Sequence, residues 1–154
     1  MRIYLAGPLF SEGQRGWQMR IKQGMQNWAA LQGLDVEVVY PYEFVEAAGK
    51  QQEEELTGHS VFVLCELALR ETDILVATLD GAQVDDGTAW EVGYFYALSG
   101  GARERILGVR TDFRRAGDAE GTRVNAMIDA SCGAIVGSLE ELLERLSPLV
   151  PGVG

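Results

Sequence analysis

The sequence is poor in metal-binding residues and in positive charge. Its 154 residues include one histidine, His59, and two cysteines, Cys65 and Cys132, far apart and without the spacing of metal ligands. Such sparse cysteines indicate a reducing compartment, so we expect a cytoplasmic protein. Thirteen Lys and Arg stand against 23 Asp and Glu, a formal net charge of −10. This balance disfavours nucleic acid polymers and anionic membranes as partners, but it is compatible with a small nucleoside or nucleotide.

Several cofactor and targeting motifs are also missing. There is no Gly-x-Gly-x-x-Gly fingerprint and no Gly-Lys-Ser/Thr of a phosphate-binding loop, which argues against dinucleotide redox chemistry and NTP hydrolysis. No apolar run is long enough to cross a bilayer. The chain starts with a strand-like run at residues 2–6 instead of the basic and apolar regions of a secretion signal, so we expect no membrane partner.

Strand and helix patterns alternate along the chain, which is typical of an α/β protein whose parallel sheet has helices on both faces. The length predicts one domain that buries about two thirds of its unfolded surface. The predicted strands are residues 2–6, 36–40, 74–79, 105–109 and 134–136. The predicted helices run from Ser11 to Gly33, over 60–72, 88–98 and 125–131, and from Ser138 to Leu149.

The first predicted helix opens with a capping box at Ser11 and Gln14 and then shows an apolar face. That face comprises Trp17, Ile21, Met25, Trp28 and Leu31. The polar stretch 46–58 fits either a surface helix or a mobile lid. The aperiodic segment 111–122 is long for a connection, which favours contact with a ligand or a neighbouring subunit.

The most informative stretch is residues 85–95, because it follows a predicted buried strand and puts three carboxylates around the start of a helix. Ligands of open α/β sheets bind beyond the carboxyl ends of the strands, and Glu91 in the first helical turn would face that crevice. A carboxylate there can attack an anomeric carbon and form a covalent glycosyl-enzyme. Asp85 would move a proton to or from the leaving group if Asp86 and Glu91 raise its pKa.

These residues also have purely structural interpretations. Thr88 and Glu91 match a capping box, in which Glu91 would only accept a hydrogen bond from a backbone N–H. Tyr4, near the carboxyl end of the first strand, fits a partner of Glu91 and equally a core tyrosine. Phe10 fits a flat wall for a nucleobase or a hydrophobic staple beside a helix cap. Asp80, followed by glycine, fits a simple turn.

Three segments together resemble the nucleoside 2-deoxyribosyltransferase family. They are Ile3-Tyr4-Leu5-Ala6-Gly7-Pro8-Leu9-Phe10, Asp85-Asp86-Gly87-Thr88-Ala89-Trp90-Glu91-Val92-Gly93-Tyr94, and Arg123-Val124-Asn125-Ala126-Met127. The resemblance covers most of the chain. It implies a single flavodoxin-like, Rossmann-like domain over residues 1–154 with a five-stranded parallel sheet.

The resemblance implies transfer of a 2-deoxyribosyl group between nucleobases through a glycosyl-glutamate, without cofactor or metal, as in nucleotide salvage. Glu91 would be the nucleophile, Asp85 the proton shuttle and Tyr4 the residue that orients Glu91. Phe10 would form a wall of the base pocket. Asn125 resembles a residue that reaches into an adjacent subunit's site, which implies a homodimer or a larger homo-oligomer. The partners would be a nucleoside and a free nucleobase.

One position departs from the family. Eight residues before Asp73, where the family often has an aspartate that contacts the deoxyribose hydroxyls, this sequence has Cys65. A thiol is a weak donor and acceptor and does not replace a carboxylate. The adjacent Glu66 would point about 100° away on a helix. We therefore expect a modified nucleoside, or a sugar held by other groups such as Asp80 or Asp112.

Two alternatives remain beside the transferase. A related branch hydrolyses nucleoside 5′-monophosphates, for which Arg15, Arg110, Arg114 and a helix N-terminus near Ser11 are available as phosphate donors. The loop of residues 7–10 resembles the nucleoside-processing form more closely, so this N-glycosidase is the second expectation. A non-catalytic nucleoside sensor on the same fold is the third.

Overall fold

The computed structural model describes residues 1–51 and 57–152. In this part the chain forms a five-stranded parallel sheet with the order β2-β1-β3-β4-β5. The strands are β1 (Arg2–Ala6), β2 (Glu37–Val39), β3 (Ile74–Thr78), β4 (Ile106–Val109) and β5 (Ala134–Val136). The register places Tyr4 of β1 between Val39 and Leu75. The predicted α/β class with one five-stranded parallel sheet is confirmed.

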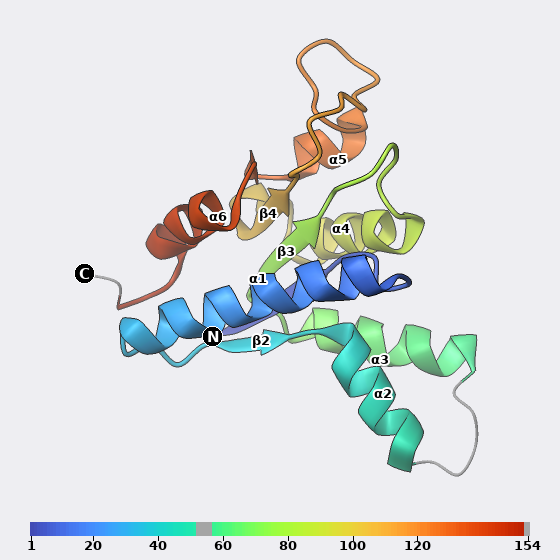
Figure 1. Cartoon of the computed structure of the whole chain (residues 1–154), viewed down its shortest axis with the longest axis vertical. Helices are drawn as coiled ribbons and strands as arrows, with labels where there is room; N and C mark the ends of the chain where they lie inside the picture. Colours follow the sequence, from blue (N-terminus) through green and yellow to red (C-terminus); the bar gives the residue numbers. More distant parts are fainter. Residues whose placement is uncertain (52–56, 153–154) are drawn as a thin grey trace.

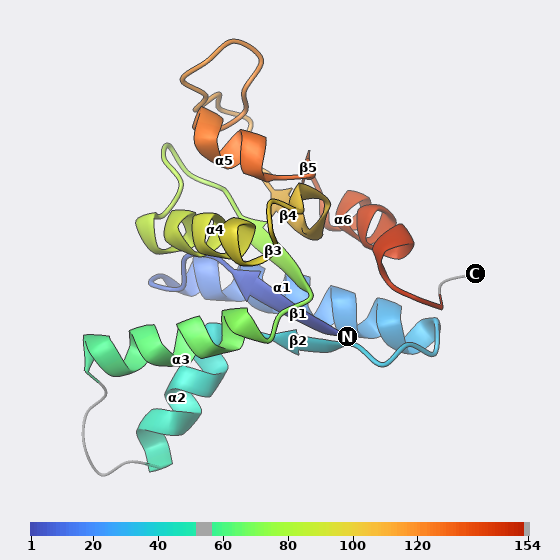
Figure 2. The same cartoon turned by 180° about the vertical axis from the view of Figure 1, so that it is seen from behind.

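Helices cover both faces of the sheet (Figures 1 and 2). One face carries α1 (Glu12–Leu31) and α6 (Leu139–Leu146), and the other carries α3 (Gly58–Arg70), α4 (Asp86–Leu98) and α5 (Ala126–Ser131). Next to α3 lies α2 (Pro41–Gln51), and two short 3-10 turns span Arg103–Arg105 and Ser147–Leu149. None of the helices described is both long and apolar enough to span a membrane.

Strand alternation divides the interior into two apolar clusters, because successive side chains of a strand point to opposite faces. Ile3 and Leu5 of β1 are buried on the α1 and α6 face together with Met25 and Leu142. Tyr4 and Ala6 are buried on the opposite face with Val92 and Phe95 of α4. The central strand therefore delivers a tyrosine side chain directly to α4.

The first helix confirms its predicted start. The Gln14 backbone N–H donates to Ser11 Oγ over 3.2 Å, and the Ser11 N–H donates to Gln14 Oε1 over 2.8 Å. Leu31, the last residue of the predicted apolar face, is 86% exposed. A helix of 20 residues is about 30 Å long, whereas the five-residue β1 spans about 17 Å, so the last turn extends past the sheet.

The region after β2 differs from the expectation. Pro41 does not merely end the strand but opens α2, where a residue without an N–H and with a fixed φ suits the first helical turn. The sequence does not distinguish between a surface helix and a mobile lid for residues 46–58. In the structure this stretch is helical as far as Gln51. Residues 52–56 lie outside the described part of the chain. Because α2 starts early, Pro41 and Tyr42 become available to the site described below.

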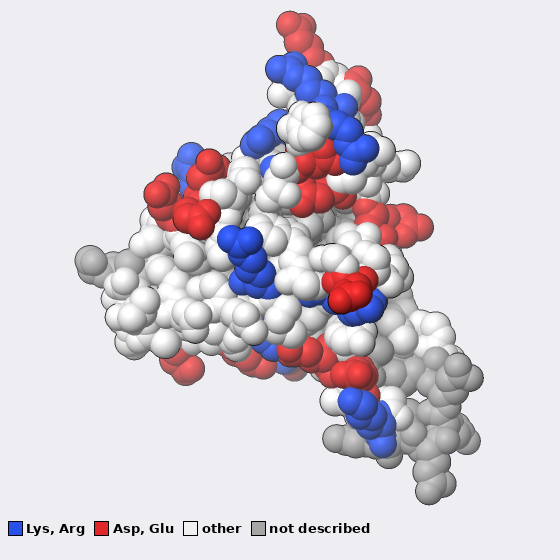
Figure 3. Space-filling model, in the orientation of Figure 1, with Lys and Arg blue, Asp and Glu red and all other residues white. Residues whose placement is uncertain are grey.

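Charged side chains are scattered over the α1 and α6 face. Figure 3 shows acidic and basic residues interspersed there, without a continuous basic surface. Phosphate backbones of nucleic acids bind extended basic patches, and this face offers none.

The core packing makes a direct prediction for α6. Leu142→Ala should lower the free energy of unfolding by about 2–5 kcal/mol, because Leu142 is fully buried and its loss leaves a cavity. Leu31→Ala removes the same atoms from an exposed position and should change it by less than about 0.5 kcal/mol. Urea unfolding followed by circular dichroism measures both. Equal losses in the two variants would contradict the described packing of α6.

Candidate active site

The centre of the site is a hydrogen bond between a strand and a helix. The Tyr4 hydroxyl donates to Glu91 Oε1 over 2.6 Å, across 87 positions of sequence. Tyr4 comes from the central strand β1 and has no exposed surface. Glu91 lies in the second turn of α4, whose Val92 and Phe95 anchor the helix in the apolar cluster that also holds Tyr4. The sheet and the helix thus fix this pair jointly.

The start of α4 decides between the two interpretations of Glu91. Asp85 is the N-cap, and its Oδ2 accepts from both the Thr88 N–H and the Thr88 hydroxyl over 3.0 Å. The helix therefore begins at Asp86, two residues before the predicted start. Thr88 is not the N-cap, so the predicted capping box of Thr88 with Glu91 does not form. The preference of aspartate for the N-cap was a usable signal in the sequence. Glu91 therefore takes no part in the helix cap.

Burial dominates the electrostatics of the pair. Loss of solvent raises the pKa of Glu91 to about 7; the hydrogen bond from Tyr4 opposes this rise, and the charge of Asp85 adds to it. Burial and the neighbouring Glu91 charge raise the pKa of Tyr4, so its hydroxyl keeps its proton and acts as a donor. Near neutral pH the Glu91 carboxyl therefore exchanges between its neutral and ionised forms.

A cavity of about 660 Å³ opens beside Glu91, within the range of small-molecule sites. It lies at the carboxyl end of β1, where open α/β sheets bind ligands. Its apolar and aromatic wall consists of Gly7, Leu9, Phe10, Pro41, Tyr42, Gly49 and Val61. Its remaining lining is Glu46, Cys65, Asp85, Gly87, Thr88 and Glu91. The structure thus brings Glu91, Asp85, Phe10 and Cys65 together around one cavity, with Tyr4 behind Glu91.

The loop that carries Phe10 is held by two side chains of α1. Gln14 Oε1 accepts from the Phe10 N–H over 3.1 Å, and Arg15 Nη1 donates to the carbonyls of Leu9 and Phe10 over 2.9 and 3.0 Å. The Arg15 guanidinium also lies 5.6 Å from the centre of the Tyr42 ring. Phe10 is 73% exposed and is not packed as a staple. Arg15 therefore joins the two aromatic walls of the cavity and does not face it.

Cys65 lies on α3 and lines the cavity together with Asp85 and Glu91. Burial raises the pKa of its thiol, so it is neutral at physiological pH. The neighbouring Glu66 does not replace the missing carboxylate. It accepts from the Tyr94 hydroxyl over 2.6 Å and from Arg70 Nε over 2.9 Å, on the outer side of α3 and α4.

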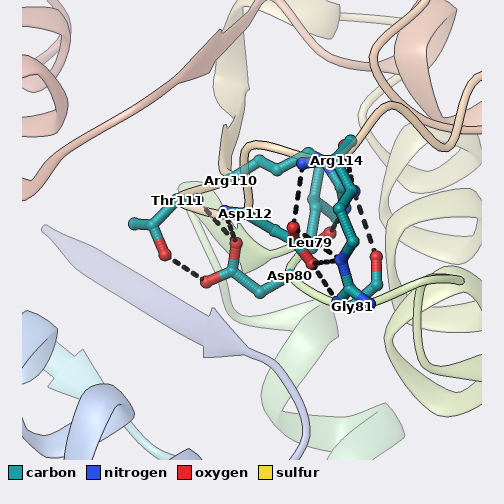
Figure 4. A network of polar contacts seen from close by, with 7 residues as sticks. All are labelled: Leu79, Asp80, Gly81, Arg110, Thr111, Asp112 and Arg114. Atoms are coloured by element: carbon teal, nitrogen blue, oxygen red, sulfur yellow. Dashed lines mark hydrogen bonds and ion pairs between the residues drawn. The ribbon is translucent and has the colours of Figure 1, made fainter.

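Asp80 is not part of this cavity. Its Oδ1 accepts from the N–H groups of Thr111 and Asp112, and its Oδ2 accepts from the Thr111 hydroxyl over 2.7 Å (Figure 4). Asp80 instead lines a second cavity on the α1 side, together with Thr111 and Asp112 of the loop after β4. Asp112 follows Asp80 into this network, where it pairs with Arg114. The structure therefore does not place either aspartate where it would contact a sugar beside Glu91.

Asn125 also lies outside the cavity. It caps α5, where its Oδ1 accepts from the Met127 N–H over 3.0 Å and its Nδ2 donates to Asp118 over 2.6 Å. Met127 beside it is 78% exposed. Within one copy of the chain, Asn125 therefore serves as the N-cap of α5.

The sequence reasoning missed the wall formed by α2 and α3. Tyr42, Glu46 and Val61 line the cavity, although the sequence marks none of them as special. The proline that opens α2 was the single available signal for Tyr42. In the described residues, no group of three His, Cys, Asp or Glu side chains is arranged to hold a metal ion.

The fold and the cavity define a doubly wound α/β protein with a small-molecule site at the carboxyl edge of its sheet. A family model described as nucleoside 2-deoxyribosyltransferase matches residues 3–127. The chain belongs to this family, whose substrates are nucleosides and nucleobases, and it is accordingly an enzyme of the pentosyltransferase type. None of the curated proteins matches the chain.

Solved structures support the fold. A conserved protein from Enterococcus faecalis V583 is 24% identical, covers 97% of this chain and 99% of its own, and superposes with a TM-score of 0.74. A 2-deoxyribosyltransferase from Bacillus psychrosaccharolyticus is 23% identical over 93% of this chain and 90% of its own, with a TM-score of 0.68. The CMP N-glycosidase of Clostridium botulinum is 15% identical over 97% and 100%, with a TM-score of 0.55.

The raised pKa of Glu91 predicts how stability depends on pH. The folded protein holds this proton more tightly than the unfolded chain, so the stabilisation is complete below the unfolded value near 4.5 and is lost as the pH rises through about 7. Glu91→Gln cannot ionise. It should therefore equal the parent near pH 4.5 and exceed it at pH 8, by up to roughly 3 kcal/mol.

Chemical unfolding between pH 4.5 and 8.5 measures this difference. Glu104→Gln is the matched control, because Glu104 is exposed and remote from the cavity, and it should leave the pH profile of the parent unchanged. A constant difference between Glu91→Gln and the parent across this range would contradict a buried, shifted carboxyl.

Proposed function

We propose that the protein transfers a 2-deoxyribosyl group from one nucleobase to another, with Glu91 as the nucleophile. The observation that carries this proposal is the half-buried Glu91 carboxyl, oriented by Tyr4 over 2.6 Å at the wall of a nucleoside-sized cavity. The substrates would be a 2′-deoxynucleoside and a free base.

In the first half of the reaction, a Glu91 oxygen attacks C1′ of the sugar. The bond between C1′ and the base nitrogen breaks, its electron pair leaves with the base, and the base takes up a proton by way of Asp85. The product is a glycosyl ester of Glu91. In the second half, a nitrogen of the incoming base attacks C1′, its proton passes to Asp85, and the Glu91 carboxylate is released.

Tyr4 and Asp85 are suited to these tasks by their contacts. Tyr4 binds Oε1 of Glu91, which holds the carboxyl in one orientation and leaves the other oxygen for attack. Asp85 uses Oδ2 for the helix cap, and Oδ1 has no partner among the described residues. That free oxygen belongs to a residue lining the cavity, so it is available for proton transfer with a base.

The cavity wall supports a nucleobase more than a phosphate. Phe10 and Tyr42 provide aromatic surfaces against which a base ring can pack. The charged residues of the lining are Glu46, Asp85 and Glu91, with no Lys or Arg among the lining residues described. A 5′-phosphate dianion would meet only negative charge there.

The three arginines considered as phosphate donors are occupied elsewhere. Arg15 binds the Leu9 and Phe10 carbonyls, Arg110 is buried against the carbonyls of Leu79 and Gly81, and Arg114 pairs with Asp112. These contacts favour the nucleoside transferase over the nucleotide N-glycosidase. Cys65 borders the sugar in this arrangement and supplies no carboxylate for its hydroxyls.

The proposal also includes assembly. Asn125 can serve a substrate only if a second copy of the chain brings α5 to the cavity, so we propose a cytoplasmic homodimer or larger homo-oligomer.

The decisive experiment follows base exchange by chromatography. The purified protein is incubated with deoxyinosine or its 5′-monophosphate, with and without adenine. We expect deoxyadenosine from the nucleoside only when adenine is present, and a loss of at least about 10³-fold in Glu91→Ala, because a covalent nucleophile is removed. Glu104→Ala, at an exposed site, is the control and should retain full activity.

Each other outcome contradicts the proposal in a distinct way. Release of hypoxanthine without acceptor, with preference for the 5′-monophosphate, would indicate the N-glycosidase. Saturable nucleoside binding without any Glu91-dependent product would indicate a sensor. Exchange that persists in Glu91→Ala would assign the nucleophile to another group.

The role of Tyr4 has a separate signature in the pH profile. The Tyr4 hydrogen bond lowers the pKa of Glu91, so Tyr4→Phe should raise this pKa further above about 7. The acid limb of kcat/KM against pH, which reports ionisation of the free enzyme, should then move to higher pH. A uniform loss of activity at all pH values, with the limb unmoved, would show that Tyr4 acts only through packing.

A further inference from the structure

A second cavity lies at the same edge of the sheet, but on the face covered by α1. It has a volume of about 460 Å³ and is bordered by Pro8, by Trp17 and Gln18 of α1, by Thr78 at the end of β3, and by the loop after β4. The loop of residues 7–10 separates the two cavities, since Gly7, Leu9 and Phe10 line the first and Pro8 lines the second. The crevice beyond the carboxyl ends of the strands is the usual ligand position of this fold class.

Three polar atoms at this cavity have no hydrogen-bond partner. They are Trp17 Nε1, Gln18 Oε1 and Thr78 Oγ1, which make up three of the five buried side-chain atoms without a partner in the described part of the chain. Gln18 is fully buried and Thr78 is 3% exposed. An unpaired buried polar group costs about 1–3 kcal/mol, so their concentration at one cavity indicates an occupant.

The free atoms define a mixed hydrogen-bonding pattern. Gln18 Nε2 donates to the Ala6 carbonyl over 3.4 Å, which leaves Oε1 as an acceptor. Trp17 Nε1 can only donate, and the Thr78 hydroxyl can do both. A Cβ on Gly7 would lie 1.6 Å from Gln18 Nε2, so the glycine makes room for this arrangement.

The charges around this cavity cancel. Asp80 and Asp112 lie beside Arg110 and Arg114, and all four are engaged in the network of Figure 4. Arg110 donates to the Gly81 and Arg114 carbonyls, and Asp80 accepts from the Thr111 and Asp112 N–H groups. Asp80, Asp112 and Arg114 line the cavity, and the buried Arg110 lies behind them, so the two carboxylates and two guanidinium groups balance within the network. The unpaired atoms belong to uncharged groups, so the ligand that they fit is a neutral one.

We propose that this cavity is a second binding site that takes a small neutral polyhydroxyl molecule, such as a free pentose. The three unpartnered atoms are buried, so the Trp17, Gln18 and Thr78 side chains shift toward the ligand when it binds. One ligand hydroxyl then accepts from Trp17 Nε1 and another donates to Gln18 Oε1, while the Thr78 hydroxyl can donate to or accept from the ligand. A nucleobase fits less well, because it needs a flat aromatic slot. The Trp17 ring is already used, packed against the α1 core and beneath the Arg20 guanidinium. The proposal does not depend on the transferase activity.

The indole N–H resonances in a proton-nitrogen NMR spectrum test this site directly. The chain has three tryptophans, Trp17, Trp28 and Trp90, and Trp17→Phe identifies the resonance of interest. We expect 2-deoxyribose or ribose to shift the Trp17 resonance saturably, and inorganic phosphate to leave it in place. Thr78→Val should weaken the sugar affinity by about three- to tenfold, the effect of one lost hydrogen bond.

Two further variants control this measurement. Thr78→Ser keeps the hydroxyl and should keep the affinity. Thr72→Val makes the same exchange two residues before β3 begins, away from this cavity, and should bind like the parent. The remaining resonances report whether each variant is folded.

Three outcomes would overturn the proposal. One is no saturable shift at Trp17 with either sugar. Another is a shift that Thr78→Val leaves unchanged. The third is contact between the Trp17 N–H and water that persists at saturating sugar, which would make ordered water the occupant.

Discussion

The hydrogen bond from Tyr4 to Glu91 is the contact on which the candidate site depends. A carboxyl group removed from water is costly to ionise, and one donor at 2.6 Å recovers part of that cost while it fixes the side chain. The bond needs a tyrosine on the α4 side of the central strand and a helix whose second turn passes above it. Strand alternation satisfies the first condition, and the Asp85 cap satisfies the second by setting where α4 begins.

The loop between β1 and α1 links this pair to the rest of the fold. Its backbone groups are bound by Gln14 and Arg15, so the helix that starts at the loop also holds it in place. One side of the loop faces the Glu91 cavity, and the other borders the cavity of Gln18 and Thr78. A change in the packing of α1 would therefore move the Phe10 side of the cavity without a direct contact to Glu91. Arg15, which joins this loop to Tyr42, acts as a brace between two walls.

The sequence predicted what local chemistry determines and missed what only packing determines. The five strands and the Ser11 cap follow from patterns within a few residues, and all were found, as was the short helix after Asn125. The structure brings Tyr4, Phe10 and Glu91 close to one cavity, and they lie at the predicted ends of neighbouring elements, which made this proximity predictable. Asp80 was expected near the sugar, but the direction of the chain after β3 depends on Thr111 and on the buried Arg110, which are 31 and 30 positions away. Tyr42 and Val61 enter the site only because α2 and α3 fold against it.

Cys65 shows how one uncharged side chain affects the whole site. The cavity already carries the carboxyls of Asp85 and Glu91, and Asp85 contributes to the raised pKa of Glu91. A further carboxylate at position 65 would add negative charge beside the same group and would raise this pKa further. The thiol stays neutral, because burial raises its pKa, and so it keeps the pKa of Glu91 near 7. In the proposed reaction, the cysteine therefore offers only weak hydrogen bonds to the sugar hydroxyls, and Glu91, the proposed nucleophile, stays partly ionised at neutral pH.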